Sequence, residues 1–230
     1  MSGIQTLTTP NGSVALLSSR QMLAALGKYY TVTEPTLGTG VAYALKTATS
    51  ATDNGFLCVS NNNALGGPNI IFDRLSITET ATAPTGTLRM TFEAIQETGI
   101  VALTGSVATR TPVQVNNAYS SSTRATVQAF SAGAATVPAA VGTRSNVAEI
   151  HVDTGVCVAH DTYSLVFGAD GYGAPKTGLT AARATDPAHI AVAAPAIIVA
   201  PQNTVWLNMY WVTAALNTPS FTYLFSYFEV

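Results

Sequence analysis

The end of the chain, residues 188–230, constrains the fold more than any other stretch. It contains three apolar runs, at residues 190–199, 204–213 and 220–230, which are separated by Pro201-Gln202-Asn203 and Asn217-Thr218-Pro219. Each run has the length of a β-strand, and each break contains residues that end strands. We therefore expect three consecutive strands at the end of the chain.

The middle run alternates strictly in sequence. One set of side chains is apolar and the other is amphipathic: Val205, Leu207, Met209 and Trp211 against Trp206, Asn208, Tyr210 and Val212. A period of two indicates a strand rather than a helix. The last run is rich in aromatic residues, which need to be covered on both sides. The ending therefore predicts the closing part of an all-β, antiparallel two-sheet sandwich.

The composition predicts a surface with little charge. Charged residues make up 10% of the 230 residues, against about 25% in an ordinary soluble domain. Threonine, alanine, serine and asparagine are abundant throughout the chain. Covering a threonine costs far less free energy than burying an unpaired charge. Such a surface favours a protein that packs against other proteins.

The charge pattern and the apolar pattern disfavour two classes of partner. The net charge is −2 and the sequence has no basic run, so the footprint of a nucleic-acid binder is missing. No apolar stretch reaches the length of about 18 residues that a membrane helix needs, and the N-terminus lacks the pattern of a signal peptide. Cys58 and Cys157 both lie in β-type runs and are expected to be buried free thiols.

The N-terminal region is expected to be an appendage. Residues 1–13 have few apolar side chains, which predicts an arm that is ordered only by contact. Residues 18–27 predict a short helix, because two serines precede it and a glycine ends it. We therefore divide the chain into an arm with a helix, residues 1–37, and a sandwich, residues 38–230. Four helix residues are candidate interface residues: Arg20, Met22, Leu23 and Leu26.

Further strands are expected between the helix and the closing runs. Residues 69–80 and 87–95 alternate in polarity and flank a six-residue turn, which predicts an antiparallel hairpin. Residues 131–145 are small and alanine-rich, which predicts a surface loop. Other short strands are expected at residues 41–48, 56–60, 120–129, 147–152, 156–159 and 163–167.

One group of residues has the character of a metal or acid–base site. His151, Asp153, His160 and Asp161 are close in sequence, but their spacing matches no zinc or carboxylate signature. The chain also lacks the nucleophile elbow of a serine hydrolase and the lysine of a phosphate-binding loop. We therefore expect no catalytic site, no metal and no cofactor. A β-sandwich enzyme remains the third alternative.

Carbohydrate binding is the strongest rival to a structural role. Trp206, Tyr210, Tyr172 and Tyr119 could stack on sugar rings. Trp206 and Tyr210, however, lie in a strand whose neighbours are equally apolar, which favours core packing or subunit contact.

Several segments resemble jelly-roll virion proteins of tailed bacteriophages. They are Gly38-Thr39-Gly40-Val41-Ala42, Ile70 to Ile77, Ala83-Pro84-Thr85-Gly86-Thr87, Pro195 to Pro201, Val205 to Trp211, and the ending after Pro219. The resemblance covers the chain from about Gly38 onward. It implies a jelly roll with no catalytic signature.

The resemblance also implies a function, a location and partners. A capsid decoration or cement protein assembles as a homo-oligomer, commonly a trimer, on the outer capsid surface after synthesis in the host cytoplasm. Its partners would be other copies of itself and the major capsid protein. We expect a face of the sheet that bears Trp206 to Trp211, or the loops beside it, to lie near the oligomer axis, with Trp206 and Tyr210 as candidate interface residues. The alternative is the receptor-binding or carbohydrate-binding head of a phage tail or collar.

Overall fold

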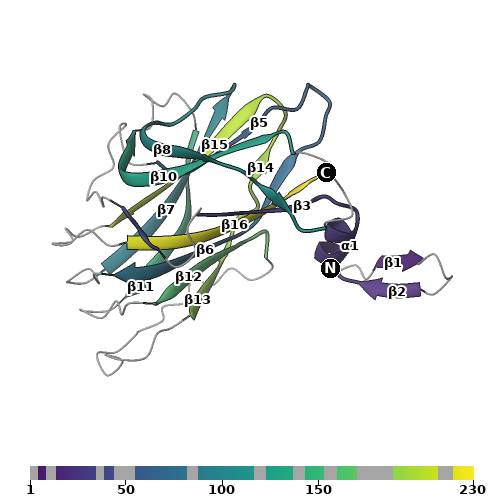
Figure 1. Ribbon diagram of the computed structural model, residues 1–230, viewed down its shortest axis with the longest axis horizontal. Coiled ribbons are helices and arrows are strands. Elements are labelled where there is room, and N and C mark those ends of the chain that lie inside the picture. The colour runs from purple at the N-terminus through teal and green to yellow at the C-terminus, as the bar shows by residue number, and fades with distance from the viewer. Residues whose placement is uncertain are drawn as a thin grey trace.

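The computed structural model is a sandwich of two β-sheets with one short helix and a two-stranded hairpin at one end (Figure 1). It describes residues 5–8, 14–34, 39–43, 55–81, 88–116, 123–136, 143–152, 160–169, 189–211 and 220–230. The elements are β1 (Gln5–Thr8), β2 (Val14–Leu17), α1 (Ser19–Ala25), β3 (Tyr29–Thr33), β4 (Val41–Ala42), β5 (Gly55–Asn61), β6 (Ile70–Ala81), β7 (Leu88–Thr98), β8 (Thr104–Arg110), β9 (Val113–Gln114), β10 (Ala125–Thr136), β11 (Thr143–Val152), β12 (Thr162–Phe167), β13 (His189–Ala194), β14 (Ile198–Val199), β15 (Asn203–Trp211) and β16 (Ser220–Glu229).

The two sheets confirm the predicted all-β sandwich. The six-stranded sheet has the order β11-β7-β15-β5-β10-β8. The eight-stranded sheet has the order β13-β12-β6-β16-β3-β9, with β14 beside β6 and β4 beside β16. Among the described strands, β12 and β13 pair in parallel and the other pairs are antiparallel. The chain crosses between the sheets repeatedly, as in Greek-key and jelly-roll sandwiches.

The last two strands lie in the interior of different sheets. β15 pairs with β7 and β5, while β16 pairs with β6 and β3. Val205, Leu207 and Met209 are buried in the main core, and Trp206 is buried on the opposite face of its sheet. The alternation predicted for this run is therefore confirmed. Because both strands have neighbours on each side, the end of the chain completes both sheets.

The core between the sheets is strongly aromatic. Tyr43, Phe56 and Phe130 contact one another with ring centroids 4.8, 4.9 and 5.6 Å apart. Phe72 packs edge-on against Phe225 at 4.9 Å. All five rings are at most 1% exposed. Burial of an apolar side chain of this size contributes about 1.5 to 3 kcal/mol, so these rings are a major source of stability.

The hairpin predicted from residues 69–80 and 87–95 is wrong in its pairing, although both strands exist. β6 pairs with β12 and β16, whereas β7 pairs with β11 and β15 in the other sheet. Stacked sheets are about 10 Å apart, and six extended residues reach roughly 20 Å. The connection is thus long enough to cross the sandwich instead of turning back.

The surface loop predicted for residues 131–145 is also wrong over much of its length. β10 continues to Thr136, and β11 begins at Thr143. The alanine-rich part of β10 pairs with β8, with an irregularity between Phe130 and Ala135. Sheet pairing therefore outweighs the low β propensity of alanine here.

The N-terminal region forms a hairpin and a capped helix. β1 and β2 pair with each other and project from the sandwich at the α1 side (Figure 1). The side chain of Ser18 accepts a hydrogen bond from the Gln21 N–H at 3.3 Å, and the Gln21 side chain accepts one from the Ser18 N–H at 2.9 Å. Gly27 ends the helix with φ +67°. The helix predicted from its caps is confirmed.

The predicted boundary between the N-terminal arm and the sandwich, after residue 37, is wrong because of the position of β3. β3 precedes that boundary, yet it pairs with β16 and β9 inside the eight-stranded sheet. The sandwich therefore includes residues before 38. No helix in the described part of the chain is long and apolar enough to cross a membrane.

Candidate docking surface

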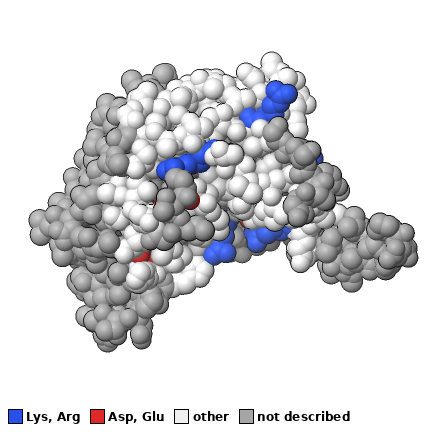
Figure 2. All heavy atoms as spheres, in the orientation of Figure 1, with Lys and Arg blue, Asp and Glu red and all other residues white. Residues whose placement is uncertain are grey.

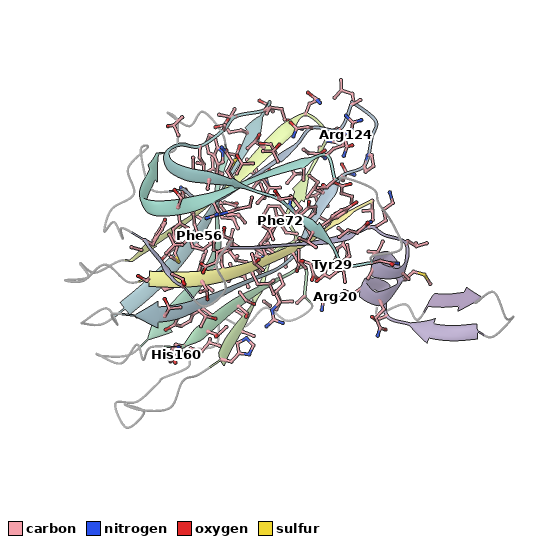
Figure 3. All side chains as sticks on the ribbon, in the orientation of Figure 1. Arg20, Tyr29, Phe56, Phe72, Arg124 and His160 are labelled. Atoms are coloured by element: carbon pink, nitrogen blue, oxygen red, sulfur yellow. The ribbon has the colours of Figure 1, made fainter. Side chains whose placement is uncertain are left out.

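Helix α1 is held against the sandwich by the carboxylate of Asp73 on β6, whose partners Arg20 and Tyr29 are labelled in Figure 3. Arg20 donates to Oδ1 of Asp73 through Nε at 2.9 Å and Nη2 at 2.5 Å. The hydroxyls of Tyr29 and Ser226 donate to Oδ2 at 2.9 and 3.1 Å. Burial raises the pKa of Tyr29, and Asp73 acts in the same direction. Four donors offset the desolvation of a carboxylate that is 4% exposed, so the helix has a fixed attachment.

The C-terminal end of α1 has a second attachment. Gln114 donates from Nε2 to the carbonyl of Gly27 at 2.6 Å, and Asn116 donates from Nδ2 to the carbonyl of Ala25 at 3.0 Å. These amides satisfy carbonyl groups that a helix end leaves without partners. The helix therefore sits rigidly on the sandwich, with the β1–β2 hairpin preceding it.

The four interface candidates on α1 face different surroundings. Met22 is 8% exposed and packs inward, and Leu23 is half-buried. Leu26 is 47% exposed, and the side chain of Arg20 is 53% exposed. Leu26 and Arg20 are thus open to a partner, whereas Met22 attaches the helix to its own chain.

Trp206 belongs to a small core on the outer side of the six-stranded sheet. It is 1% exposed and packs with Cys58, Ile95 and Leu103. Its Nε1 donates to the carbonyl of Val101 at 3.4 Å. Of the two fates predicted for Trp206, core packing is the one observed, and this side chain cannot contact a subunit. The side chain of Tyr210 lies outside the described residues, as do Tyr119 and Tyr172.

The buried thiol of Cys58 agrees with the sequence prediction. It is a free cysteine, and burial raises its pKa to about 12. Cys157 lies outside the described residues.

The outer face of the eight-stranded sheet carries paired hydroxyl groups. The hydroxyls of Thr78 and Thr162 are 2.8 Å apart, and those of Ser76 and Ser164 are also 2.8 Å apart. Leu224, which pairs with Ser76 in the neighbouring strand, is 40% exposed. Hydroxyls that already bond to each other cost little free energy to bury, because they keep a hydrogen-bond partner when another protein displaces water from them. The Ser164 hydroxyl also bonds to Arg74 at 3.1 Å and to the exposed His189 at 2.9 Å, so this face combines hydroxyl pairs with one half-buried cation.

The histidine and aspartate group does not form a site among the described residues. Asp161 is fully buried, whereas His160 beside it is exposed and has φ +81°. Asp153 and the side chain of His151 lie outside the described residues. Within the described part of the chain, no three histidine, cysteine or acidic side chains are grouped as metal ligands would be.

The sequence pattern did not predict the burial of two acids on β6. Asp73 and Glu79 both lie on β6, where the alternating pattern alone does not reveal burial. Glu79 is 1% exposed, and neither of its carboxylate oxygens has a hydrogen-bond partner among the residues that the structure describes. Burial and then the charge of Asp161 raise the pKa of Glu79 to about 8. No local sequence signal marks Asp73, because its partner Arg20 lies 53 residues away along the chain.

An open cleft of about 260 Å³ lies where β7 ends and β15 begins. Its lining residues include Glu97, Thr98, Thr143, Ile198, Asn203 and Thr204. None of its lining residues is aromatic, so the cleft lacks the flat platform on which sugar rings stack.

Comparisons with known proteins found no match among protein-family models, curated proteins or solved structures.

Proposed function

We propose that the protein is a structural virion component that decorates the outer surface of a phage capsid and bridges neighbouring capsomers. The observation that carries this proposal is the N-terminal unit formed by the β1–β2 hairpin and α1. An isolated two-stranded hairpin is at best marginally stable in water. A hairpin that projects from the sandwich is therefore suited to pair with, or lie on, a neighbouring molecule.

The rest of the molecule supports the same role. Its eight-stranded sheet presents neutral hydroxyls and the exposed side chain of Leu224. Many weak contacts of this kind can sum through multiple copies on a shell. We further propose that the protein forms a homo-oligomer, specifically a trimer, and that this oligomer binds the major capsid protein.

Removal of residues 1–17 tests the proposal. Ser18 must remain, because it caps α1. The truncated protein should keep its sandwich, as judged by circular dichroism and thermal unfolding, but should bind stripped virus particles much more weakly than the intact protein. Equal binding by the truncated and intact proteins would contradict the role of the N-terminal unit. Light scattering that gives only a monomer at micromolar concentration would contradict the oligomer.

A receptor-binding or carbohydrate-binding head is the second candidate. The cleft beside β14 and β15 favours it, because amides, hydroxyls and the Glu97 carboxylate are groups that bind sugars. The lack of aromatic lining weighs against it. A glycan array separates the two functions, since the decoration role predicts no specific glycan.

A further inference from the structure

The distribution of charge over the described residues differs from what the net charge suggests. The chain carries a net charge of −2. Yet every acid whose side chain is described is buried or half-buried, the buried ones being Glu34, Asp73, Glu79, Asp161 and Glu229. Three of the five described cations, by contrast, are exposed: Arg20, Lys28 and Arg124. The part of the surface that the structure describes is therefore positive, and Figure 2 shows blue atoms on the visible face with little red.

Figure 3 shows Arg20 and Arg124 on the side of the sandwich that carries α1, and the N–H of Lys28 donates to the carbonyl of Leu23 on this helix at 2.8 Å. The N–H of Glu229 donates to the carbonyl of Lys28 at 3.0 Å, and the Glu229 side chain accepts from the N–H of Arg124 at 3.3 Å. Arg20 lies on the helix itself. Within the described part of the chain, neither Lys28 nor Arg124 forms an ion pair, so their charges are available to a partner.

Exposed aliphatic side chains lie among these cations. Leu26 is 47% exposed, Val115 is 51% exposed and Val230 is 46% exposed. The N–H of Val115 donates to the carbonyl of Tyr29 at 3.1 Å, which places Val115 next to the segment after the helix. We call the surface formed by Arg20, Leu26, Lys28, Val115, Arg124 and Val230 the α1 end.

Exposed cations beside exposed apolar side chains are a combination found at protein interfaces, whose rims are polar. Asp73 offsets the charge of Arg20, and the buried carboxylate of Glu229 lies beside the backbone of Arg124, so the three cations and these two acids leave one net positive charge at this end. A nucleic-acid surface would instead require several basic side chains in a continuous stripe, because affinity grows with the number of phosphates contacted. The chemistry of the α1 end therefore fits an acidic protein surface with an apolar centre.

We propose that the α1 end docks onto an acidic, partly apolar protein surface of the virus particle, with Lys28 and Arg124 facing carboxylates of that partner. This inference rests on the proposed decoration function and specifies the chemistry of the partner. Arg20 contributes less, because it is already paired with Asp73.

The test measures binding of the full-length protein to virus particles from which it has been stripped. The test variant is Lys28→Gln with Arg124→Gln, which removes both free cations. The matched control is Thr109→Glu with Ala191→Glu, which gives the same change in net charge at exposed positions on other strands. Thermal unfolding of both variants verifies that they remain folded.

The proposal predicts that wild-type binding weakens about tenfold or more between roughly 50 and 300 mM NaCl. It also predicts that the test variant binds roughly tenfold more weakly than wild type at low salt, and that the control binds like wild type. If binding does not depend on salt and both variants bind like wild type, the partner surface is not acidic. This result would contradict the present proposal but not the decoration function. No wild-type binding to particles would overturn both.

A labelled DNA duplex provides the remaining comparison. Fluorescence anisotropy should show no binding of the wild-type protein to the duplex at about 150 mM NaCl. Duplex binding that the test variant loses would assign the α1 end to nucleic acid and would overturn the proposal.

Discussion

Replacement of Glu79 by glutamine should make the folded protein more stable than wild type at alkaline pH. Glu79 is 1% exposed, and both carboxylate oxygens lack hydrogen-bond partners. Burial, with a contribution from the charge of Asp161, raises its pKa from 4.5 to about 8. The folded protein therefore binds a proton here between these two values, whereas the unfolded chain releases it.

The direction in which stability changes with pH follows from the difference between the pKa values of Glu79 in the folded and unfolded states. A carboxyl group whose pKa is raised on folding favours the folded state fully below about pH 4.5, and its contribution is lost as the pH rises through about 8. At about 1.4 kcal/mol per pH unit, the loss amounts to roughly 4 to 5 kcal/mol. Glu34, which is buried and also without hydrogen-bond partners, has a pKa that burial raises in the same direction.

Urea unfolding at several pH values measures this difference. At about pH 5 the Glu79→Gln variant should match wild type within roughly 1 kcal/mol, because both side chains are then neutral and similar in size. At about pH 9 the variant should be the more stable by at least about 2 kcal/mol. Glu97→Gln, the same change at a half-buried position, is the control and should follow wild type. Parallel curves for wild type and Glu79→Gln across this range would refute the reasoning.

Three further substitutions test the packing of the sandwich and the attachment of α1. Gly40→Ala should destabilise the fold by about 1 to 3 kcal/mol in urea unfolding, since an added Cβ would lie 1.7 Å from Oγ1 of Thr80, and an unchanged midpoint would contradict this close approach. Trp206→Ala should cost about 3 to 5 kcal/mol because it empties the outer core, whereas a loss below about 1 kcal/mol would indicate that the ring is not packed there. Asp73→Ala should lower stability by about 2 kcal/mol and speed tryptic cleavage after Arg20, and a cleavage rate equal to that of wild type would show that the helix is held in another way.

Local sequence patterns predicted the elements whose cause is local. The capping residues of α1 predicted its position, because Ser18 and Gly27 act within one turn of the helix. The alternation in β15 predicted which side chains face the main core, since successive strand residues point to opposite faces. The outer core around Trp206 was foreseen only as one of two alternatives.

Long-range features could not be predicted in this way. The separation of β6 and β7 into different sheets depends on partners that lie far along the chain, such as β16 and β11. The burial of Asp73 depends on Arg20, whose position opposite β6 follows only from the tertiary fold. The burial of five of the described acids is likewise a property of the assembled sandwich, so the net charge of the sequence does not reveal the exposed cations of the α1 end.

The location and copy number of the protein in purified virions test the central claim most directly. Quantitative mass spectrometry gives the copy number relative to the major capsid protein, and cross-linking identifies the neighbours of Lys28. The account predicts many copies per particle and cross-links from Lys28 to an acidic segment of the shell. A few copies cross-linked to tail proteins, or no protein in the particle, would contradict it.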